Sequence, residues 1–204
     1  MARRCEVRGS FVSAENSTTA RVIFTTERLT VRLATANDVD LYCQLWTDPR
    51  VMTNVGFPKG LPITRDKIHE RLAKTGASEF DRLLVVELNS NRQAIGECKM
   101  STPNCEGIAT TDVKLLPEEW GHGYGAEVKR GLLNHLFANS DCTAVEATPN
   151  VNNIASIKMQ EAVGGIRVGE VTHNFPESMQ GFTTPVHHYI YRVNRTDWQQ
   201  RQGA

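Results

Sequence analysis

The centre of the chain reads Val113-Lys-Leu-Leu-Pro-Glu-Glu-Trp-Gly-His-Gly-Tyr-Gly-Ala-Glu127. It begins as an apolar strand pattern, turns through the alternating glycines Gly121, Gly123 and Gly125, and continues as a helical pattern. Glycines let the backbone turn tightly and expose successive N–H groups, and the helix N-terminus adds the positive end of its dipole. The stretch predicts a main-chain cradle for phosphate groups. On the glycines alone, an ordinary Gly-rich turn is an equal alternative.

Two common nucleotide motifs do not fit this spacing. A P-loop has the pattern G-x-x-x-x-G-K-[ST], but Lys129 lies too far beyond Gly125 and no Ser or Thr follows it. A dinucleotide fingerprint has the pattern G-x-G-x-x-G early in a parallel sheet, and the alternating glycines depart from it. Both nucleotide-binding interpretations are therefore disfavoured.

Strand and helix patterns on both sides of the glycines indicate one mixed α/β domain. Thr64 is expected to cap a helix, because Ile63 and Ile68 stand at the positions of a hydrophobic staple. An earlier helix follows Asn37-Asp38 and is expected to stop at Asp48-Pro49, and later helices follow Gly125 and Asn153. Strand patterns cover about 29–33, 83–88, 94–100, 108–116, 142–148, 166–171 and 186–193, with a further short pattern at 22–24.

Composition excludes several classes of protein. The 204 residues carry 23 Lys and Arg against 23 Asp and Glu, and this zero net charge argues against binding of nucleic acid by a broad basic surface. No apolar run has the length of a membrane span, and the N-terminus lacks the apolar centre of a secretory signal. The five cysteines are odd in number without zinc-type spacing. We expect reduced thiols, no metal, no nucleic-acid or membrane partner, and a cytoplasmic protein.

Two motifs resemble those of a known family. The stretch from Leu116 to Glu127 is similar to the acetyl-coenzyme A signature of the GNAT acetyltransferases, in which Arg or Gln precedes x-x-G-x-[GA]; Trp120 stands in that first position. The stretch Asn153-Ile-Ala-Ser-Ile-Lys-Met-Gln-Glu-Ala-Val-Gly164 resembles N-x-x-S followed by E-K-x-G-F in the ribosomal-protein N-acetyltransferase (Rim-type) subgroup. The chain departs from this second motif at Ala162 and Gly165.

The resemblance extends over about residues 26–198. It implies the GNAT fold, an α/β (α+β) architecture whose splayed, mixed, mostly antiparallel sheet has six or seven strands and about four helices. We expect this domain at 25–198, between a flexible N-terminal arm at 1–24 and a C-terminal tail at 199–204.

The resemblance also implies a binding mode for acetyl-coenzyme A. Leu115 and Leu116 should pair with the pantetheine arm, while Asn153 and Ser156 should lie along that arm near the thioester. Asn153 can equally serve as a helix N-cap. Main-chain N–H groups should hold the pyrophosphate, and they belong to His122, Gly123, Tyr124, Gly125 and Ala126.

In this family a neutral amine attacks the thioester directly. A carboxylate of raised pKa or a chain of water molecules would take the proton of the amine, and the candidates are Asp112, Glu97 and, less favoured, Glu87. Many members protonate the leaving thiolate with a Tyr, but Gln160 stands at that position, so Ser156 is the candidate acid. A backbone N–H near Leu115 would meet the charge on the thioester oxygen.

The acceptor is the least determined part. The subgroup resemblance implies the N-terminal α-amine of a protein. The alternatives are a small-molecule amine, such as an aminoglycoside, a polyamine or an amino acid, and a non-catalytic acyl-coenzyme A sensor. Phe57 could line an acceptor pocket or belong to the core. His187 and His188 are adjacent in a strand and must face opposite sides, so they cannot share a metal. A homodimer is left open.

Overall fold

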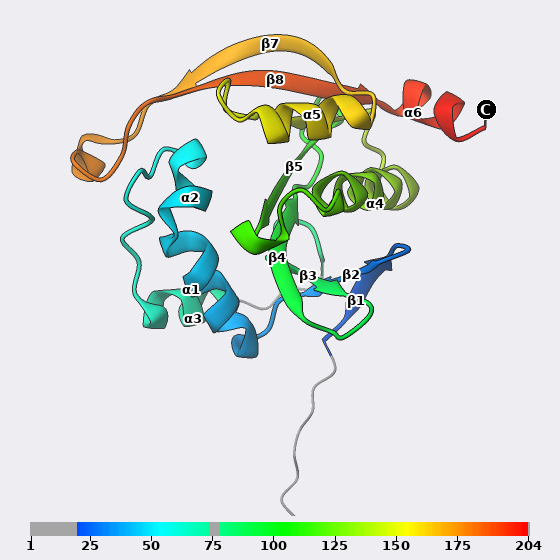
Figure 1. Ribbon diagram of the computed structural model, residues 1–204. Coiled ribbons are helices and arrows are strands. Elements are labelled where there is room, and N and C mark those ends of the chain that lie inside the picture. Colours follow the sequence, from blue (N-terminus) through cyan, green and yellow to red (C-terminus); the bar gives the residue numbers. More distant parts are fainter. Residues whose placement is uncertain (1–19, 74–77, 204) are drawn as a thin grey trace, which may run out of the picture.

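The computed structural model describes residues 20–73 and 78–203, and Figure 1 shows their arrangement. Within these ranges the strands form one sheet in the order β1-β2-β3-β4-β5-β6-β8-β7. Neighbours pair antiparallel except β5 and β6, which are parallel. The strands are β1 (Val22–Thr25), β2 (Leu29–Leu33), β3 (Leu84–Leu88), β4 (Ala94–Met100), β5 (Ile108–Leu115), β6 (Ala144–Ala147), β7 (Ile166–His173) and β8 (Val186–Asn194).

Helices cover both faces of the sheet. In Figure 1, the helices α1 to α3 lie on one side, α4 and α5 lie on the other, and the β7–β8 hairpin arches across both groups. The helices are α1 (Val39–Thr47), α2 (Pro49–Met52), α3 (Arg65–Leu72), α4 (Tyr124–Asn139), α5 (Ile154–Ala162) and α6 (Arg195–Gln202). Short 3₁₀ turns occur at Ala36–Asp38, Thr53–Val55, Pro117–Glu119 and Glu177–Met179.

Local sequence signals set the helix boundaries. The Thr64 side chain accepts a hydrogen bond from the Lys67 N–H and caps α3, and Ile63 and Ile68 join the same apolar cluster, as the staple predicted. Helix α1 ends at Thr47, as expected from Asp48-Pro49. Pro49 then begins α2 at a position where its missing N–H costs nothing, with Asp48 as the cap.

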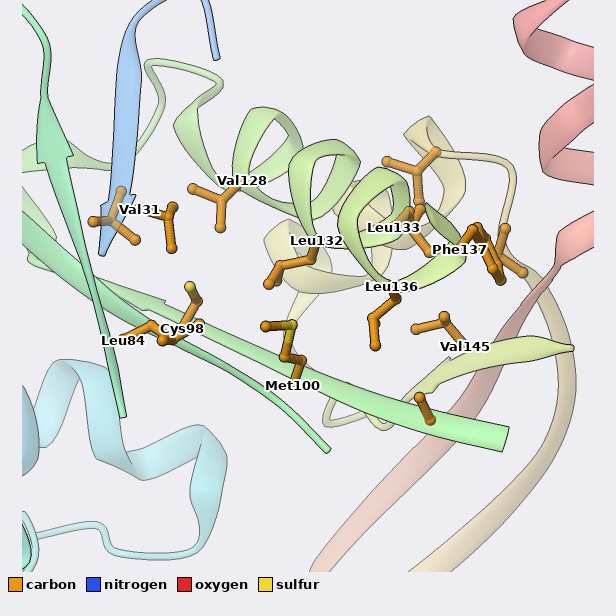
Figure 2. Close-up of a cluster of buried hydrophobic side chains, with 14 of the residues drawn as sticks. Val31, Leu84, Cys98, Met100, Val128, Leu132, Leu133, Leu136, Phe137 and Val145 are labelled. Carbon is orange, nitrogen blue, oxygen red and sulfur yellow. The ribbon is translucent and has the colours of Figure 1, made fainter. Parts of the chain in front are cut away.

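Two apolar clusters hold the helices to the sheet. Figure 2 shows the larger one, in which Val128, Leu132 and Leu136 of α4 pack toward Cys98 and Met100 of β4. The second cluster packs α1 and α3 on the opposite side of the sheet, around Tyr42, Leu45 and Ile68. Burial of both layers fixes the sheet between them, because apolar area removed from water is the main stabilising contribution to folding.

The sheet opens between β5 and β6. Their pairing runs from Ile108 opposite Ala144 to Thr110 opposite Glu146, and β6 ends one residue later. Strand β5 continues to Leu115 and pairs only with β4 there. The strands therefore diverge, and one edge of β5 is left without a strand neighbour.

The expected GNAT fold with its splayed mixed sheet is confirmed, with two differences in number. Among the described residues there are eight strands rather than six or seven, because the pattern at 22–24 does form a strand against β2. There are six α-helices rather than four, because Pro49 initiates α2 and residues 195–202 form α6. Helix α6 runs through the boundary suggested at residue 198, and residues 1–19 of the expected arm lie outside the described residues.

Two expectations from composition can be compared with the structure. The four cysteines in the described ranges are free thiols. None of the helices in the described part of the chain is both long enough and apolar enough to span a membrane.

Candidate active site

A cleft of about 1220 Å³ follows the open edge of β5. Helix α5 and the glycine turn before α4 line one half of it, and α2 and the β7–β8 hairpin line the other half. We call these the turn half and the hairpin half. Because β5 runs between them, a ligand that passes through the opening of the sheet can reach both.

The glycine turn has the backbone conformation that its sequence predicts. Gly121 and Gly123 have φ values of 81° and 80°, in the left-handed region that favours glycine. Gly123 is the N-cap of α4 and supplies no side-chain hydrogen bond, so the first N–H groups of the helix stay open to a ligand. A Cβ on Gly125 would lie 3.1 Å from the Met159 sulfur of α5, so this glycine keeps the two helices close.

A salt bridge from the β1–β2 turn holds the glycine turn in place. The carboxylate of Glu127 in α4 accepts hydrogen bonds from the Thr26 hydroxyl (2.5 Å), the Arg28 backbone N–H (2.9 Å) and the Arg28 Nε (2.7 Å). Arg28 in turn donates to the His122 carbonyl at 3.0 Å and lies 4.7 Å from the centre of the Tyr124 ring. Although burial opposes its ionisation, these hydrogen bonds keep the pKa of Glu127 below its usual value.

Main-chain groups of β5 face the opening. The Leu116 N–H donates to the Ile95 carbonyl of β4 at 2.9 Å, so by alternation the N–H groups of Val113 and Leu115 point away from β4. The indole N–H of Trp120 donates to the Leu115 carbonyl at 2.9 Å. Leu116 is not part of the cleft lining among the described residues: its side chain packs in the α1–α3 cluster and its carbonyl accepts from Glu119.

The second motif begins helix α5 beside the cleft. Asn153 caps this helix by accepting a hydrogen bond from the Ser156 N–H at 3.1 Å, and both residues line the cleft. The N-cap role of Asn153 is therefore confirmed. Tyr124, Gly123, Gly125 and Ala126 also line the cleft, whereas His122 does not, and its ring stacks on Tyr124 with centroids 5.5 Å apart.

The two carboxylates expected as bases differ in position. Asp112 lines the cleft with its side chain 58% exposed, whereas Glu97 is buried outside the lining and accepts from the Trp46 indole at 2.8 Å. Lys114 forms ion pairs with both. Partial desolvation by the walls of the cleft favours the neutral acid, but the ammonium of Lys114 outweighs it and lowers the pKa of Asp112. The expectation of a raised pKa is therefore wrong for Asp112. Glu87 pairs with Arg32 and Arg92, away from the lining.

The hairpin half is built from segments far apart in sequence. The β7–β8 loop reaches the segment that follows α2 through a hydrogen bond of 2.9 Å from the Thr184 N–H to the Gly56 carbonyl. Phe57 and Phe175 meet edge to face with ring centroids 5.3 Å apart. Gly56 has a φ of 96°, and a Cβ there would lie 2.5 Å from the Phe175 ring. Phe57 is buried and lines the cleft, so it serves both the core and the pocket.

A buried lysine marks the point where the sheet opens. Lys129 of α4 is 1% exposed and donates to the Thr111 hydroxyl of β5. Burial lowers the pKa of Lys129 to about 7, against an opposing contribution from Asp112. In the sequence, Lys129 stands out only because it lacks the spacing of a P-loop lysine. Its place in the apolar stripe of α4, one residue from Val128, was the signal that it faces the sheet.

Several other lining residues were not predicted. Arg50 of α2, Lys99 of β4 and His188 of β8 all face the cleft. Alternation along the strand correctly predicted that His187 and His188 face opposite sides of the sheet. His187 pairs with Glu170 at a distance of 2.7 Å, and neither of these two residues lines the cleft. What the sequence could not supply was the side of the sheet that would be open.

The fold and site fit an acyltransferase: a strand–helix turn with open N–H groups lies next to an open strand edge that leads to a second pocket. The sequence matches the family described as "Acetyltransferase (GNAT) domain" over residues 28–166. The chain belongs to this family and is an acyltransferase.

Relatives and solved structures are similar over most of the chain. An uncharacterized N-acetyltransferase p20 of Bacillus licheniformis is 29% identical over 139 residues, 66% of this chain and 76% of that protein. A spermidine N-acetyltransferase of Vibrio cholerae, in complex with CoA and spermine, has a TM-score of 0.71 at 17% identity and covers 85% of this chain and 99% of its own. The aminoglycoside acetyltransferase AAC(6')-Ib, in complex with coenzyme A, has a TM-score of 0.66 at 20% identity with 85% and 99% covered.

Proposed function

We propose that this acyltransferase moves an acetyl group from acetyl-coenzyme A to the N-terminal α-amine of a protein, by direct attack in a ternary complex. The Rim-type second motif at Asn153 and Ser156 is part of the basis for this choice. The observation that carries it is the charge of the cleft, whose described lining has no excess of acidic side chains.

The turn half fits the coenzyme. The left-handed glycines and the uncapped N-terminus of α4 offer N–H groups and a helix dipole to the pyrophosphate. The unpaired edge of β5 offers main-chain groups to the pantetheine arm, next to Asn153 and Ser156. When bound, acetyl-coenzyme A supplies an activated acyl group as its thioester. Solved relatives in complex with CoA support this assignment.

The residues of the chain then divide the reaction between them. The Leu115 N–H, which points away from β4, is placed to stabilise negative charge on the thioester oxygen. The Ser156 hydroxyl is the candidate donor of a proton or hydrogen bond to the leaving sulfur. Asp112 lies on the hairpin side, opposite α4, where an ionised carboxylate held by Lys114 can attract and orient a protonated amine.

The charge of the lining supports an acceptor with a single amine. Three acidic side chains line the cleft, Asp81, Asp112 and Glu119, against four basic ones, Arg50, Lys99, Lys114 and Lys158. A polycation would bring several ammonium groups to a lining without surplus carboxylates, and like charges in a cleft repel. A peptide with an N-terminal α-amine followed by neutral peptide groups brings only one ammonium group.

A small-molecule amine is the second candidate. Structures with similar folds contain spermine or are named aminoglycoside acetyltransferases. The contact of the β7–β8 loop with Gly56 also bounds the hairpin half at one end, as a compact acceptor would require.

Calorimetric titration with acetyl-coenzyme A, followed by a thiol-release assay over peptides, spermine, kanamycin and free amino acids, separates these functions. We expect binding at one site and the fastest release with peptides that carry a free N-terminus. Release with spermine or kanamycin alone would favour the second candidate. Binding without release on any amine would indicate a sensor, and absence of binding would contradict the whole proposal. A Ser156→Ala variant with full turnover would remove Ser156 as the acid.

A further inference from the structure

We propose that His188 of β8 is the catalytic base that takes the proton from the acceptor amine. This inference rests on the proposed transfer to an amine. It assigns a residue to the removal of the proton from the acceptor, a step for which the lowered pKa of Asp112 and the buried position of Glu97 are unfavourable. His188 is half-buried and lines the hairpin half of the cleft. It belongs to β8, one strand of the hairpin that arches across both groups of helices in Figure 1.

The orientation of the ring follows from the strand register. His188 is bridged to Asn150, and the Asn150 carbonyl accepts from the N–H of Asn153, the cap of α5. The imidazole therefore sits beside the start of the helix that carries Ser156. Its partner across the β7–β8 ladder is Val171, which lines the cleft as well. His187, the next residue, points to the other face and pairs with Glu170.

The two ring nitrogens have different surroundings. Nδ1 is buried and has no hydrogen-bond partner among the described residues. The backbone of Thr148 lies close enough to favour a protonated nitrogen. A neutral imidazole carries a proton on one nitrogen and a lone pair on the other. We assign the proton to the buried Nδ1, which leaves the lone pair on Nε2 as the acceptor of a proton in the cleft that His188 lines.

Burial first, and the neighbouring histidines second, keep the ring neutral near pH 7. Burial is the largest cause of the lowered pKa of His188, and His173 of β7 and His187 of β8 lower it further, against the opposing contribution of Thr148. Across the cleft, Asp112 and Lys114 of β5 pair with each other, and Arg50 of α2 pairs with Asp48. An unpaired neutral imidazole accepts a proton more readily than a carboxylate bound to an ammonium.

The proposed step balances in protons and bonds. Nε2 of His188 takes one proton from the acceptor ammonium, and the freed lone pair on nitrogen attacks the thioester carbonyl carbon. The C–N bond forms, and the C–S bond breaks with its electron pair on sulfur. The second proton of the amine nitrogen passes to the sulfur, directly or through Ser156, which gives a free thiol and an amide. His188 then returns its proton to water.

The test measures kcat/KM for the acceptor peptide as a function of pH. It compares the wild-type protein with two variants, His188→Gln and His187→Gln. The acceptor's own titration is common to all three enzymes and cancels in the ratio of wild type to variant. For His188→Gln we expect a ratio of about 100 above pH 7 that falls toward 1 as the pH drops below the pKa of His188. For His187→Gln, the matched neighbour on the opposite face, we expect a ratio near 1 at every pH.

Each outcome is decisive. A ratio for His188→Gln that is large but independent of pH would indicate a structural effect and would overturn the proposal, as would a ratio near 1 throughout. Coenzyme affinity measured by calorimetry should be unchanged in both variants, and His188→Asn replaces His188→Gln if the latter fails to fold. A wild-type protein that binds acetyl-coenzyme A but releases no thiol would overturn the proposed function and this inference together, whereas wild-type release with a flat ratio overturns this inference alone.

Discussion

The two halves of the cleft are built from different parts of the chain. In the turn half, the groups that face the ligand are main-chain N–H groups of a glycine turn and of β5, and the side chains of Arg28 and Glu127 only hold the turn in place. In the hairpin half, the groups are side chains from α2, β5, β7 and β8. A main-chain site tolerates change in most side chains, so it suits a ligand that is always the same. A side-chain site can diverge, as an acceptor site must.

The strongest test of this division is Gly123→Val in the turn half. Its φ of 80° is costly for a β-branched residue, and the strain would reorient the first N–H groups of α4. We expect acetyl-coenzyme A affinity, measured by calorimetry, to fall about 10- to 100-fold. The matched control is Gly181→Val, which has a φ of 87° and equally open space in the β7–β8 loop. Equal losses in both variants would contradict a specific role for the turn.

A smaller effect is expected from Glu127→Gln, which weakens the support behind the turn. The neutral amide cannot pair with Arg28 and still accept three hydrogen bonds, so we expect a loss of about 1–2 kcal/mol in the free energy of unfolding, discounted for the exposure of Arg28. Coenzyme affinity should fall several-fold. Urea unfolding and calorimetry measure both, with the exposed Glu118→Gln as control. Unchanged affinity would show that the turn keeps its shape without this salt bridge.

The matching substitution in the hairpin half is Gly56→Ala. The Cβ of the new alanine would lie 2.5 Å from the Phe175 ring, so the β7–β8 loop must shift away from the segment that follows α2. We expect the KM for the acceptor to rise several-fold while coenzyme affinity stays the same. Gly169→Ala in β7, where the new Cβ makes an ordinary contact of 3.5 Å, is the control. A change in coenzyme affinity without a change in acceptor KM would show that the halves are not independent.

Of these variants, Lys129→Met should change coenzyme affinity and acceptor KM the least. It should, however, change how the free energy of unfolding depends on pH. The pKa of Lys129 is lowered to about 7 in the folded protein, below its unfolded value of 10.5, so the unfolded chain binds more protons between these values. Stability of the wild-type protein should therefore rise with pH across this window, by a few kcal/mol at most. Thermal unfolding at pH 7 to 9.5 should show this rise in the wild type and in the exposed-site control Lys67→Met, but not in Lys129→Met. A rise in all three would contradict the assignment.

The sequence predicted the turn half better because its signals are local. Glycine spacing, the cap at Asn153 and the strand pattern before Leu116 each act within a few residues, and the structure agrees with all of them. Two of the residues expected there do not line the cleft: Leu116 packs in the α1–α3 cluster, and His122 lies one position before the lining residue Gly123.

The hairpin half depends on contacts that no local pattern reveals. Asp112 and Glu97 look alike in sequence, but one is exposed at the cleft and the other buried beneath Trp46. Whether Lys114 would also pair with Glu97 depends on the register of β4 against β5. His188 reaches the cleft because the β7–β8 hairpin arches across both groups of helices, which is a property of the whole sheet (Figure 1).

The most direct test of the central claim is the position of the acetyl group after a competition reaction. The wild-type protein, acetyl-coenzyme A, spermine and a peptide with both a free N-terminus and an internal lysine are incubated together, and the products are sequenced by tandem mass spectrometry. We predict acetylation of the peptide α-amine. Acetylated spermine with an unmodified peptide would contradict the account of the hairpin half.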